Sequence, residues 1–213
     1  MKMTKTKLAK GFTLVELLVV IAIIAALAAL STPVVLKQQK KANATTAVNN
    51  AKQIFLLLFE YDQENAAYPT GSDSNVALGT LISEGYTTSE EIFFAKSPIS
   101  KKPDGDISTS SAILTTDELG FKYVDALSAG KASGLPLLGA PFSVKAANGY
   151  TMDAEAYGGS AVVLFNDGSA RTIRIANDLA PGGGDPNVFA STKLGSSSNG
   201  ILALDSTATD PTP

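Results

Sequence analysis

The 213-residue sequence contains no cysteine, no histidine and no tryptophan. Without cysteine the chain forms no disulfide, and its cysteine content does not indicate a redox compartment. Without histidine and cysteine it cannot build a Ser-His or Cys-His catalytic arrangement, or a metal site that uses either side chain as a ligand. Carboxylates are the remaining candidates for acid-base catalysis or metal binding.

Basic residues are fewer than acidic ones, with 17 Lys and Arg against 20 Asp and Glu and a formal net charge of −3 at pH 7. Proteins that bind nucleic acid without sequence preference neutralise phosphates with lysine and arginine. We therefore expect no nucleic-acid partner, because only small local patches of this chain could contact phosphate.

Apolar residues are concentrated near the N-terminus. Lys2, Lys5, Lys7 and Lys10 form a basic segment without any acid, and a nearly continuous apolar run follows from 12 to 30. As a helix, these 19 residues would be about 28 Å long at ~1.5 Å per residue, close to the ~30 Å hydrocarbon core of a bilayer. The pattern predicts a membrane helix whose basic end stays in the cytoplasm.

The boundary between the two segments carries a distinct motif. A conventional secretory signal is cut after its apolar run, here near "ALAALSTP", whereas a cut before the run leaves the helix in the product. The second alternative is favoured because Gly11 separates the basic segment from Phe12, and because the acid Glu16 follows shortly after. The stretch from Gly11 to Glu16 reads GFTLVE. It resembles, without departure, the leader motif of the type IV pilin and type II secretion pseudopilin superfamily.

The resemblance implies that a prepilin peptidase cuts between Gly11 and Phe12 on the cytoplasmic side and then methylates the new amino group of Phe12. It also implies that Glu16 pairs with the amino terminus of a neighbouring subunit as that subunit enters a filament. The implied partners are further copies of this chain, other pilin-like subunits, the inner-membrane assembly platform and membrane lipid. The implied location is the bacterial inner membrane, crossed once, with the C-terminal domain on the periplasmic side.

The position of Glu16 also has a physical reason of its own. A carboxylate at membrane depth costs about 2.5 to 3.5 kcal/mol on insertion scales, so it is rare without a partner. In a staggered array the cationic amino end of one helix can meet Glu16 of the next, which turns this penalty into a subunit contact. The alternative is an interfacial acid near a helix end that reaches the lipid headgroups.

Beyond the apolar run, Pro33 predicts a kink or a loosened helix near residues 29 to 33, because proline lacks a backbone N–H and crowds the preceding turn. The alternative of a helix that ends there is disfavoured, since helical spacing resumes up to the Tyr68-Pro69 step. Lys52 and Gln53 lie off the apolar stripe of this continuation. The stripe itself, which predicts a core face, consists of Ala44, Ala47, Val48, Ala51, Ile54, Phe55, Leu58 and Tyr61.

The predicted fold class is α+β: a long N-terminal helix, half transmembrane and half amphipathic, packed on a small C-terminal antiparallel β-sheet as in pilins. The predicted segments are a cleaved leader (1–11), a transmembrane and polymerisation helix (12–33), an amphipathic continuation (34–67), a globular domain (68–180) and a Gly/Ser/Thr/Pro-rich tail (181–213). Within the domain, "ALGTLISEGY" predicts a short helix or turn, and "GFKYVDAL" and "PFSVKA" predict strands. The runs 161–165 and 170–175 flank an Asp-Gly turn and predict a hairpin.

Two acidic turns are weak candidates for calcium binding. "KPDGDIS" offers Asp104 and Asp106, and "GGGDPN" offers Asp185 and Asn187, but neither has the spacing of a recognised calcium loop. Some major pseudopilins bind calcium in a C-terminal loop, which keeps the possibility open. Solvated turns are favoured, and no other cofactor is expected.

The favoured function is a structural filament subunit of a type II secretion pseudopilus or a type IV pilus, and not an enzyme. The lack of cysteine removes the C-terminal disulfide loop of many adhesive pilins, which favours a pseudopilin. Glu16 argues against a tip-capping subunit, because tip subunits often lack this acid.

Two alternatives belong to other classes. A membrane-anchored hydrolase would use acids such as Glu90-Glu91 or Asp117-Glu118, yet neighbouring acids on a helix or strand point apart and share no cleft. A DNA-uptake minor pilin is disfavoured because loss of the four leader lysines leaves 17 − 4 = 13 basic against 20 acidic residues, a net charge of −7.

Overall fold

The computed structural model describes residues 12–98, 100–105, 107, 114, 118–124, 127–131, 134–146, 149–153, 155–174 and 208–209. The chain divides into two compact units, Met1–Gln39 and Lys40–Pro213. Helix α1, Leu14–Asn65, begins in the first unit and ends in the second. The predicted leader, residues 1–11, lies outside the described residues.

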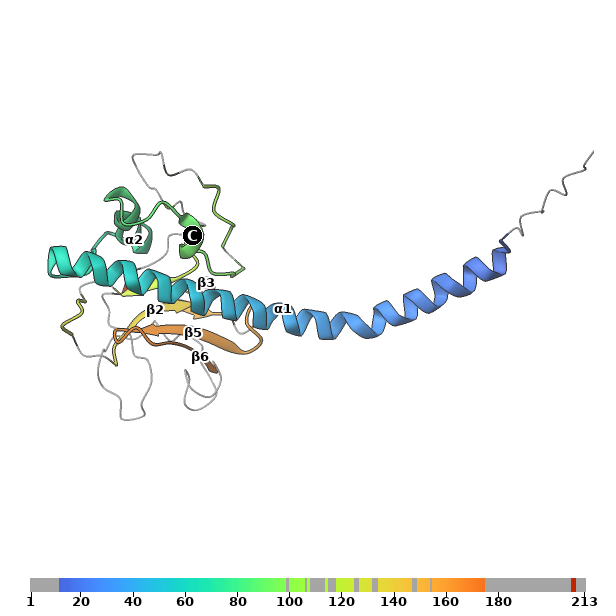
Figure 1. The fold of residues 1–213 in the computed structure, drawn as a ribbon. Helices are drawn as coiled ribbons and strands as arrows, with labels where there is room; N and C mark the ends of the chain where they lie inside the picture. The colour runs from blue at the N-terminus through green and yellow to red at the C-terminus, as the bar shows by residue number, and fades with distance from the viewer. Residues whose placement is uncertain are drawn as a thin grey trace, which may run out of the picture. The chain divides into compact units, whose positions relative to one another are not determined.

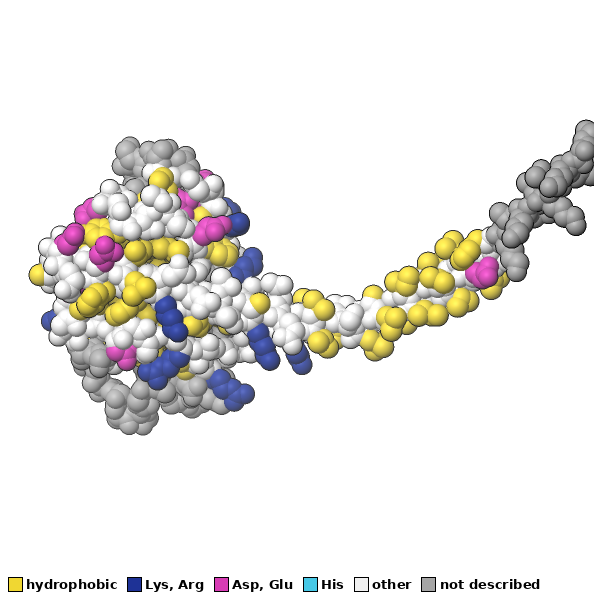
Figure 2. All heavy atoms as spheres, viewed as in Figure 1, with side chains coloured by type: hydrophobic (Ala, Val, Ile, Leu, Met, Phe, Trp, Pro, Cys, Tyr) yellow, Lys and Arg dark blue, Asp and Glu magenta, His cyan; other side chains and the backbone are white. Residues whose placement is uncertain are grey.

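In the first unit, the structure describes Phe12, Thr13 and the part of α1 that extends to Gln39. Every described residue of this unit is exposed, and the helix is long and apolar enough to cross a membrane, judged by length and composition. The space-filling view shows apolar side chains covering this part of α1 (Figure 2). A surface of this kind needs lipid or another helix around it.

Helix α1 continues through Pro33 without interruption, which confirms that the helix does not end there. The hydroxyls of Ser31 and Thr32 both donate to the carbonyl oxygen of Ala28, at 3.1 and 2.8 Å. These bonds run back along the helix in the turn that leads into the proline, where the missing N–H of Pro33 removes one backbone bond. The kink at Pro33 stays a prediction.

In the second unit, the C-terminal part of α1 supplies one side of the core. The buried residues recur at steps of three and four and are Ala44, Ala47, Ala51, Ile54 and Leu58. Val48, Phe55 and Tyr61 pack against them and are partly buried. Lys52 and Gln53 are exposed. The predicted core face is therefore confirmed, since a 3.6-residue period places all these apolar residues on one side of the helix.

This face of α1 packs on a five-stranded antiparallel sheet of order β6-β5-β2-β1-β7 (Figure 1). The strands are β1 (Lys122–Val124), β2 (Pro136–Ala140), β5 (Ser160–Phe165), β6 (Ala170–Arg174) and β7 (Ala208–Thr209). A separate two-stranded sheet pairs β3 (Phe142–Ala146) with β4 (Gly149–Met152). The α+β class with a long helix on a small antiparallel sheet is confirmed.

The predicted hairpin is β5 and β6, joined by the turn that contains Asp167-Gly168. The amide of Gly168 donates to the Phe165 carbonyl, and the amide of Phe165 donates to the Ser169 carbonyl, both at 2.9 Å. Gly168 has φ +77, which explains why glycine stands there. It also lies against α1, because a Cβ at Gly168 would approach Phe55 Cε1 within 2.6 Å.

The short helical segments lie between α1 and the sheet strands in sequence. Helix α2, Ser74–Ser83, is capped by Asp73, whose side chain accepts a hydrogen bond from the Val76 amide at 2.9 Å. It starts earlier than the predicted segment because this cap lies upstream of the apolar spacing. A 3₁₀ turn, η1, covers Glu90–Phe93. Neither η1 nor the central strand β2 was predicted.

Of the predicted tail, 181–213, the structure describes only β7, which pairs with β1 through Tyr123–Thr209 and Val124–Ala208. A stretch of the predicted tail thus joins the edge of the main sheet. The pairing is backbone to backbone and needs no apolar pattern, which is why the composition gave no sign of it.

Candidate assembly site at the start of helix α1

The first turn of α1 holds the acid on which the predicted assembly chemistry depends. Thr13 precedes the helix, and Glu16 lies three residues later in the first turn. The Thr13 amide donates to Oε2 of Glu16 at 2.9 Å, and the Glu16 amide donates to Oγ1 of Thr13 at 3.2 Å. This reciprocal pair is a capping box, in which two otherwise unsatisfied amides at a helix start find acceptors.

A third bond strengthens the box. The hydroxyl of Thr13 donates to the same oxygen, Oε2 of Glu16, at 2.7 Å. Both bonds to the carboxylate therefore end on one oxygen, and Oε1 accepts none from the residues that the structure describes. The carboxylate also lies at the N-terminal end of the helix, where the helix dipole favours negative charge.

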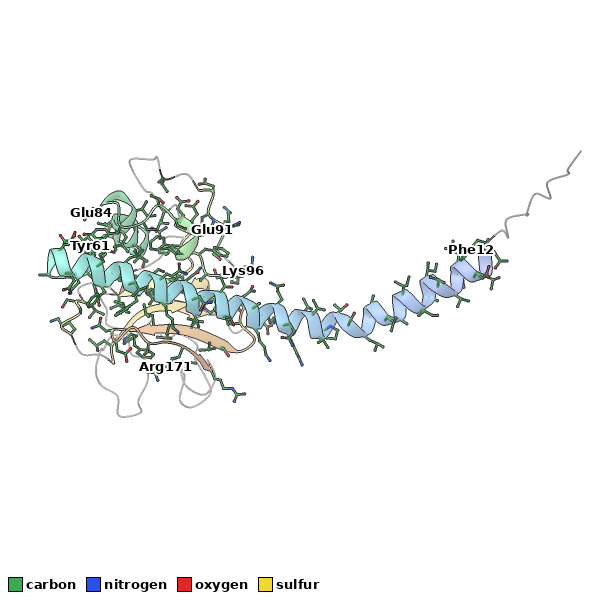
Figure 3. All side chains as sticks on the ribbon, in the orientation of Figure 1. Phe12, Tyr61, Glu84, Glu91, Lys96 and Arg171 are labelled. Atoms are coloured by element: carbon green, nitrogen blue, oxygen red, sulfur yellow. The ribbon has the colours of Figure 1, made fainter. Side chains whose placement is uncertain are left out.

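The residues around the capping box in the sequence are apolar, and none of them carries a positive charge that could balance Glu16. Glu16 is the only charged residue from Phe12 to Leu36. Phe12 lies just ahead of the first turn and is 74% exposed (Figure 3). Leu14, Val15 and Leu17 beside Glu16 are exposed too. The site therefore combines one hydrogen-bonded carboxylate with a bare apolar helix surface.

Of the predicted site residues, Phe12 lies two residues before the helix and Glu16 lies in its first turn, and Gly11 lies outside the described residues. Their roles in cleavage, methylation and assembly stay predictions. Thr13 was missed as the partner of Glu16. Its signal was present, because Thr-x-x-Glu directly before an apolar run is the sequence pattern of a capping box.

This region of the chain is similar to known proteins. Residues 6–32 match the family model described as the prokaryotic N-terminal methylation motif. This part of the chain therefore carries the N-terminal methylation motif. No solved structure gives a significant match.

Three relatives support the assignment. The type IV wide pilus major component PilA4 of Thermus thermophilus is 45% identical over 73 residues, which are 33% of this chain and 54% of the relative. The type II secretion system core protein G of Pseudomonas aeruginosa is 40% identical over 68 residues, or 32% and 48% of the two chains. Core protein G of Dickeya chrysanthemi is 35% identical over 81 residues, or 38% and 51%. The chain thus spans about half the length of these relatives.

A second group of charged side chains gathers in the globular unit. Carboxylate oxygens of Glu90, Asp104 and Glu118 lie within 4.8 Å of one another. Glu90 and Glu118 are only 3% and 5% exposed. Oε2 of Glu90 accepts from the Gly105 amide at 2.8 Å, and Oε1 of Glu118 accepts from the Asp104 amide at 3.2 Å. Through these hydrogen bonds the two acids hold the backbone at Asp104 and Gly105 in place.

This cluster could not be found from neighbouring acids in the sequence, because its members come from separate segments. Its oxygens are of the kind that calcium prefers, but acidic groups gather without a metal in many proteins. Asp104 stays a weak candidate for calcium binding, with a solvated turn as the favoured alternative, and Asp106 and Asp185 lie outside the described residues.

Beside α1 lies an open groove of about 510 Å³, lined in part by Asn50, Glu91, Phe94 and Lys102. Asn50 Nδ2 donates to the carbonyls of Glu91 and Phe94, at 3.1 and 2.9 Å, and so ties η1 to the helix. Glu91 lies at the surface (Figure 3). Its carboxylate pairs with the ammonium group of Lys102 at 3.2 Å. Among the described residues that line the groove, Glu91 is the only carboxylate.

Proposed function

We propose that this chain is a structural subunit that polymerises through its N-terminal helix into a type II secretion pseudopilus or a type IV pilus-like filament. The observation that carries the proposal is the match of residues 6–32 to the N-terminal methylation motif. The names of the relatives, a pilus component and two secretion core proteins, support it. The exposed apolar half of α1 provides a surface for lipid before assembly and for other helices after it.

Before assembly, the subunit is proposed to lie in the bacterial inner membrane. The lysines of the leader hold the N-terminus in the cytoplasm, and the unit that begins at Lys40 is placed on the periplasmic side. A prepilin peptidase cuts between Gly11 and Phe12 and methylates the amino group of Phe12. An inner-membrane assembly platform then adds the subunit to a polymer of this chain and other pilin-like subunits.

Assembly is proposed to pair Glu16 of one subunit with the methylated amino group of Phe12 on a neighbour. Cleavage creates this cation, because the nitrogen of Phe12 is an uncharged amide until the bond to Gly11 is cut. In lipid the carboxylate is costly, and an opposite charge at hydrogen-bond distance offsets the cost. Pairing is therefore favoured only after cleavage and only where subunits meet.

Two relatives come from secretion systems and one from a pilus, so the kind of filament rests on a further feature. The chain has no cysteine and cannot form the C-terminal disulfide of many adhesive pilins. This supports the pseudopilus. No catalytic role is proposed, and the charge of −7 after cleavage (13 basic against 20 acidic residues) does not favour binding to nucleic acid.

The test compares the polymer formed by wild type, Glu16→Leu and Glu16→Gln in cells whose own copy of the gene is deleted. Shearable or secreted polymer is measured against membrane-resident subunit. We expect both variants to be cleaved and both to lose polymer, with Glu16→Leu inserting into the membrane at least as well as wild type because a charge has been removed.

Glu60→Gln, an exposed acid in the globular unit, is the matched control and should polymerise normally. Normal polymer from Glu16→Leu would show that the carboxylate is not the assembly contact. Absence of any polymer from the wild-type chain, in a strain with a working peptidase and platform, would contradict the proposed function as a whole.

A further inference from the structure

We propose that neighbouring copies of this chain meet through their globular units: the exposed side chains of Leu56 and Phe59 on one copy enter the groove beside α1 of the next. This inference rests on the proposed function and names a contact of the polymer outside the N-terminal apolar run. Both surfaces lie in the unit that begins at Lys40, so each subunit carries the two halves of the contact on one folded body.

In the globular unit, helix α1 carries two further strips of side chains besides its buried core face. The groove strip is Thr46, Asn50 and Gln53, which line the groove. The apolar strip is Lys52, Leu56 and Phe59, all of which are exposed. With ~3.6 residues per turn, the core face and these two strips point in directions about 120° apart around the helix. Each copy can therefore offer both surfaces at once without opening its core.

The apolar strip exposes two large side chains that the fold itself does not bury. Leu56 is 65% exposed and Phe59 is 44% exposed. The ring of Phe59 stacks on that of Phe55, with 6.3 Å between the centroids, and Phe55 packs against the core and against Gly168 in the β5-β6 turn. Phe59 is thus held in place before any contact, which lowers the entropy lost on binding and suits an aromatic anchor.

The groove has the size and the lining to receive such side chains. Its volume of about 510 Å³ lies within the ~300 to 1,000 Å³ range of pockets that take small molecules. Apolar groups are supplied by Ile92, Phe94 and Pro103, which are partly buried. The wall is fixed, because Asn50 donates to two carbonyls of η1 and its end, at 3.1 and 2.9 Å. An apolar side chain from a neighbour finds there a rigid surface that is part apolar.

The two surfaces also differ in charge. Figure 3 shows Arg171 on one side of α1 and Glu84 and Glu91 on the other. Lys52 lies on the apolar strip, and the Glu91 side chain at the groove is 70% exposed even though it pairs with Lys102. In the proposed contact, Lys52 of one copy meets Glu91 of the next. An exposed ion pair adds little affinity, but complementary charge fixes the register in which two surfaces meet.

The contact joins two different surfaces and is therefore heterologous. Such a contact repeats from copy to copy and generates either a closed ring or an open helical filament. Along α1, Leu56 and Phe59 lie about eight residues beyond the centre of the groove strip, roughly 12 Å at ~1.5 Å per residue. When the helices of two copies run parallel, each new copy is displaced by this step along the helix direction. A flat ring is thereby excluded, and the contact extends a filament.

The first experiment detects the contact by cross-linking, which a chain without cysteine allows free of background. Leu56→Cys and Thr46→Cys are combined in one full-length chain in the deletion strain, and the polymer that forms is treated with a bis-maleimide. The two positions lie ~15 Å apart along one helix, so a shorter cross-linker cannot join them within a copy. We expect a ladder of dimers, trimers and larger species, because each copy is joined to two neighbours.

The controls for the ladder are the two single variants and a displaced pair. Each single cysteine should leave the chain monomeric on a denaturing gel, because a heterologous contact never brings the same position of two copies together. Leu56→Cys combined with Ser83→Cys is the displaced pair, since Ser83 is exposed and is not among the residues that line the groove. This pair should give no ladder.

The second experiment tests whether the contact supports the polymer. Leu56→Asp should lower the amount of polymer about tenfold or more, because burial of one leucine side chain is lost. Leu56→Met keeps an apolar side chain of similar volume and should stay near wild type. Val76→Asp is the matched control, since Val76 on α2 is 44% exposed, as Phe59 is, and belongs to neither surface. Equal melting temperatures in detergent separate a lost contact from lost folding, and if Leu56→Asp melts earlier the cross-link decides alone.

Polymer that forms without the Thr46–Leu56 ladder would overturn this inference and leave the proposed function standing. Dimers from Leu56→Cys alone would also overturn it, because the apolar strips would then face each other. Normal polymer from Leu56→Asp, or an equal loss in Val76→Asp, would show that the apolar strip is not the contact. Absence of any polymer from the wild-type chain would instead contradict the proposed function.

Discussion

At the scale of single residues, Gly120 shows a constraint that comes from the tertiary fold. Its amide donates to the Phe93 carbonyl at 3.0 Å, and the two backbones touch. A Cβ at this position would lie 2.2 Å from both the nitrogen and the carbonyl oxygen of Ala95. Backbone atoms cannot move aside as the end of a flexible side chain can, so only glycine fits between them.

We therefore expect Gly120→Ala to lower the free energy of unfolding by about 1 to 3 kcal/mol or more, the range for overpacking. Gly134→Ala is the control, because its Cβ would meet nothing within 4 Å and its φ is not positive. Urea unfolding of the two full-length variants in detergent, followed by tyrosine fluorescence, checks the difference. Equal midpoints would show that the contact at Ala95 relaxes without cost.

Tyr68 gives a prediction on pH. It is 1% exposed, and its hydroxyl has no hydrogen-bond partner among the described residues. Burial, with a smaller effect of the charge on Asp62, raises the pKa of Tyr68 to about 12. In the unfolded chain the pKa is about 10. The folded state thus favours the neutral phenol, so this stability is fully present below about pH 10 and is lost as pH rises toward 12.

Tyr68→Phe should keep the packing and lose this dependence. We expect little change at pH 7, since no partner of the hydroxyl is left behind, and a smaller loss of stability between pH 9 and pH 11.5 than in wild type. Urea midpoints measured across this range test the expectation. A variant that loses stability with pH as steeply as wild type would assign the alkaline sensitivity to other groups.

Some of these single-residue features could be predicted from the sequence and others could not. Glu16 and Phe12 were predicted because the motif and its effects are local, and Thr13 could have been predicted for the same reason. The close contact at Gly120 and the meeting of Glu90 with Glu118 could not be predicted, because they are built by segments far apart in sequence.

At the scale of elements, helix α1 places a core face toward the sheet. Leu58 is fully buried on this face, whereas Gln53 is exposed and, among the described residues, its side chain donates only to the Asn49 carbonyl, at a long 3.4 Å. We expect Leu58→Ala to lower the free energy of unfolding by about 2 to 5 kcal/mol, the usual cost of such a cavity. Gln53→Ala should change it by less than about 0.5 kcal/mol.

Thermal unfolding of the two full-length variants checks this pair. Equal melting temperatures would show that the buried face of α1 has been placed wrongly. The pair isolates the face because both residues lie within two turns of one helix and the substitutions differ mainly in burial.

The elements differ in how readily the sequence reveals them. The core face of α1 and the β5-β6 hairpin follow from a 3.6-residue period and an Asp-Gly turn. Strand β2 was missed because it opens with Pro136, contains Gly139 and is buried at every position, so it shows no alternation. Strand β7 was missed because its two residues carry no pattern at all.

At the scale of the whole molecule, the two alternative cleavage sites predict different mature proteins. A cut before Phe12 removes four of the 17 basic residues and no acid, and it leaves the entire apolar run attached to the globular unit. A cut near Thr32 would remove the run and release the globular unit from the membrane. The two outcomes differ in mass, in charge and in location.

We expect intact-mass measurement on membrane-extracted protein to show a chain that begins at Phe12 and carries one added methyl group. Gly11→Val should block the cut, because it replaces a small, flexible residue beside the cleaved bond, and the uncut chain should keep the mass of the leader. Ala9→Val is the control, since it makes the same kind of change two residues away from that bond.

The measurement separates two mechanisms of membrane attachment. With the cut before Phe12, the mature chain keeps a helix long and apolar enough to span a bilayer, and it carries its acid and its new amino group at the same end, as the proposed assembly requires. A mature N-terminus near Thr32, with the protein in the soluble fraction, would mean that the apolar run is only a secretion signal. The capping box at Thr13 and Glu16 would then be discarded with it, and neither residue could take part in a filament.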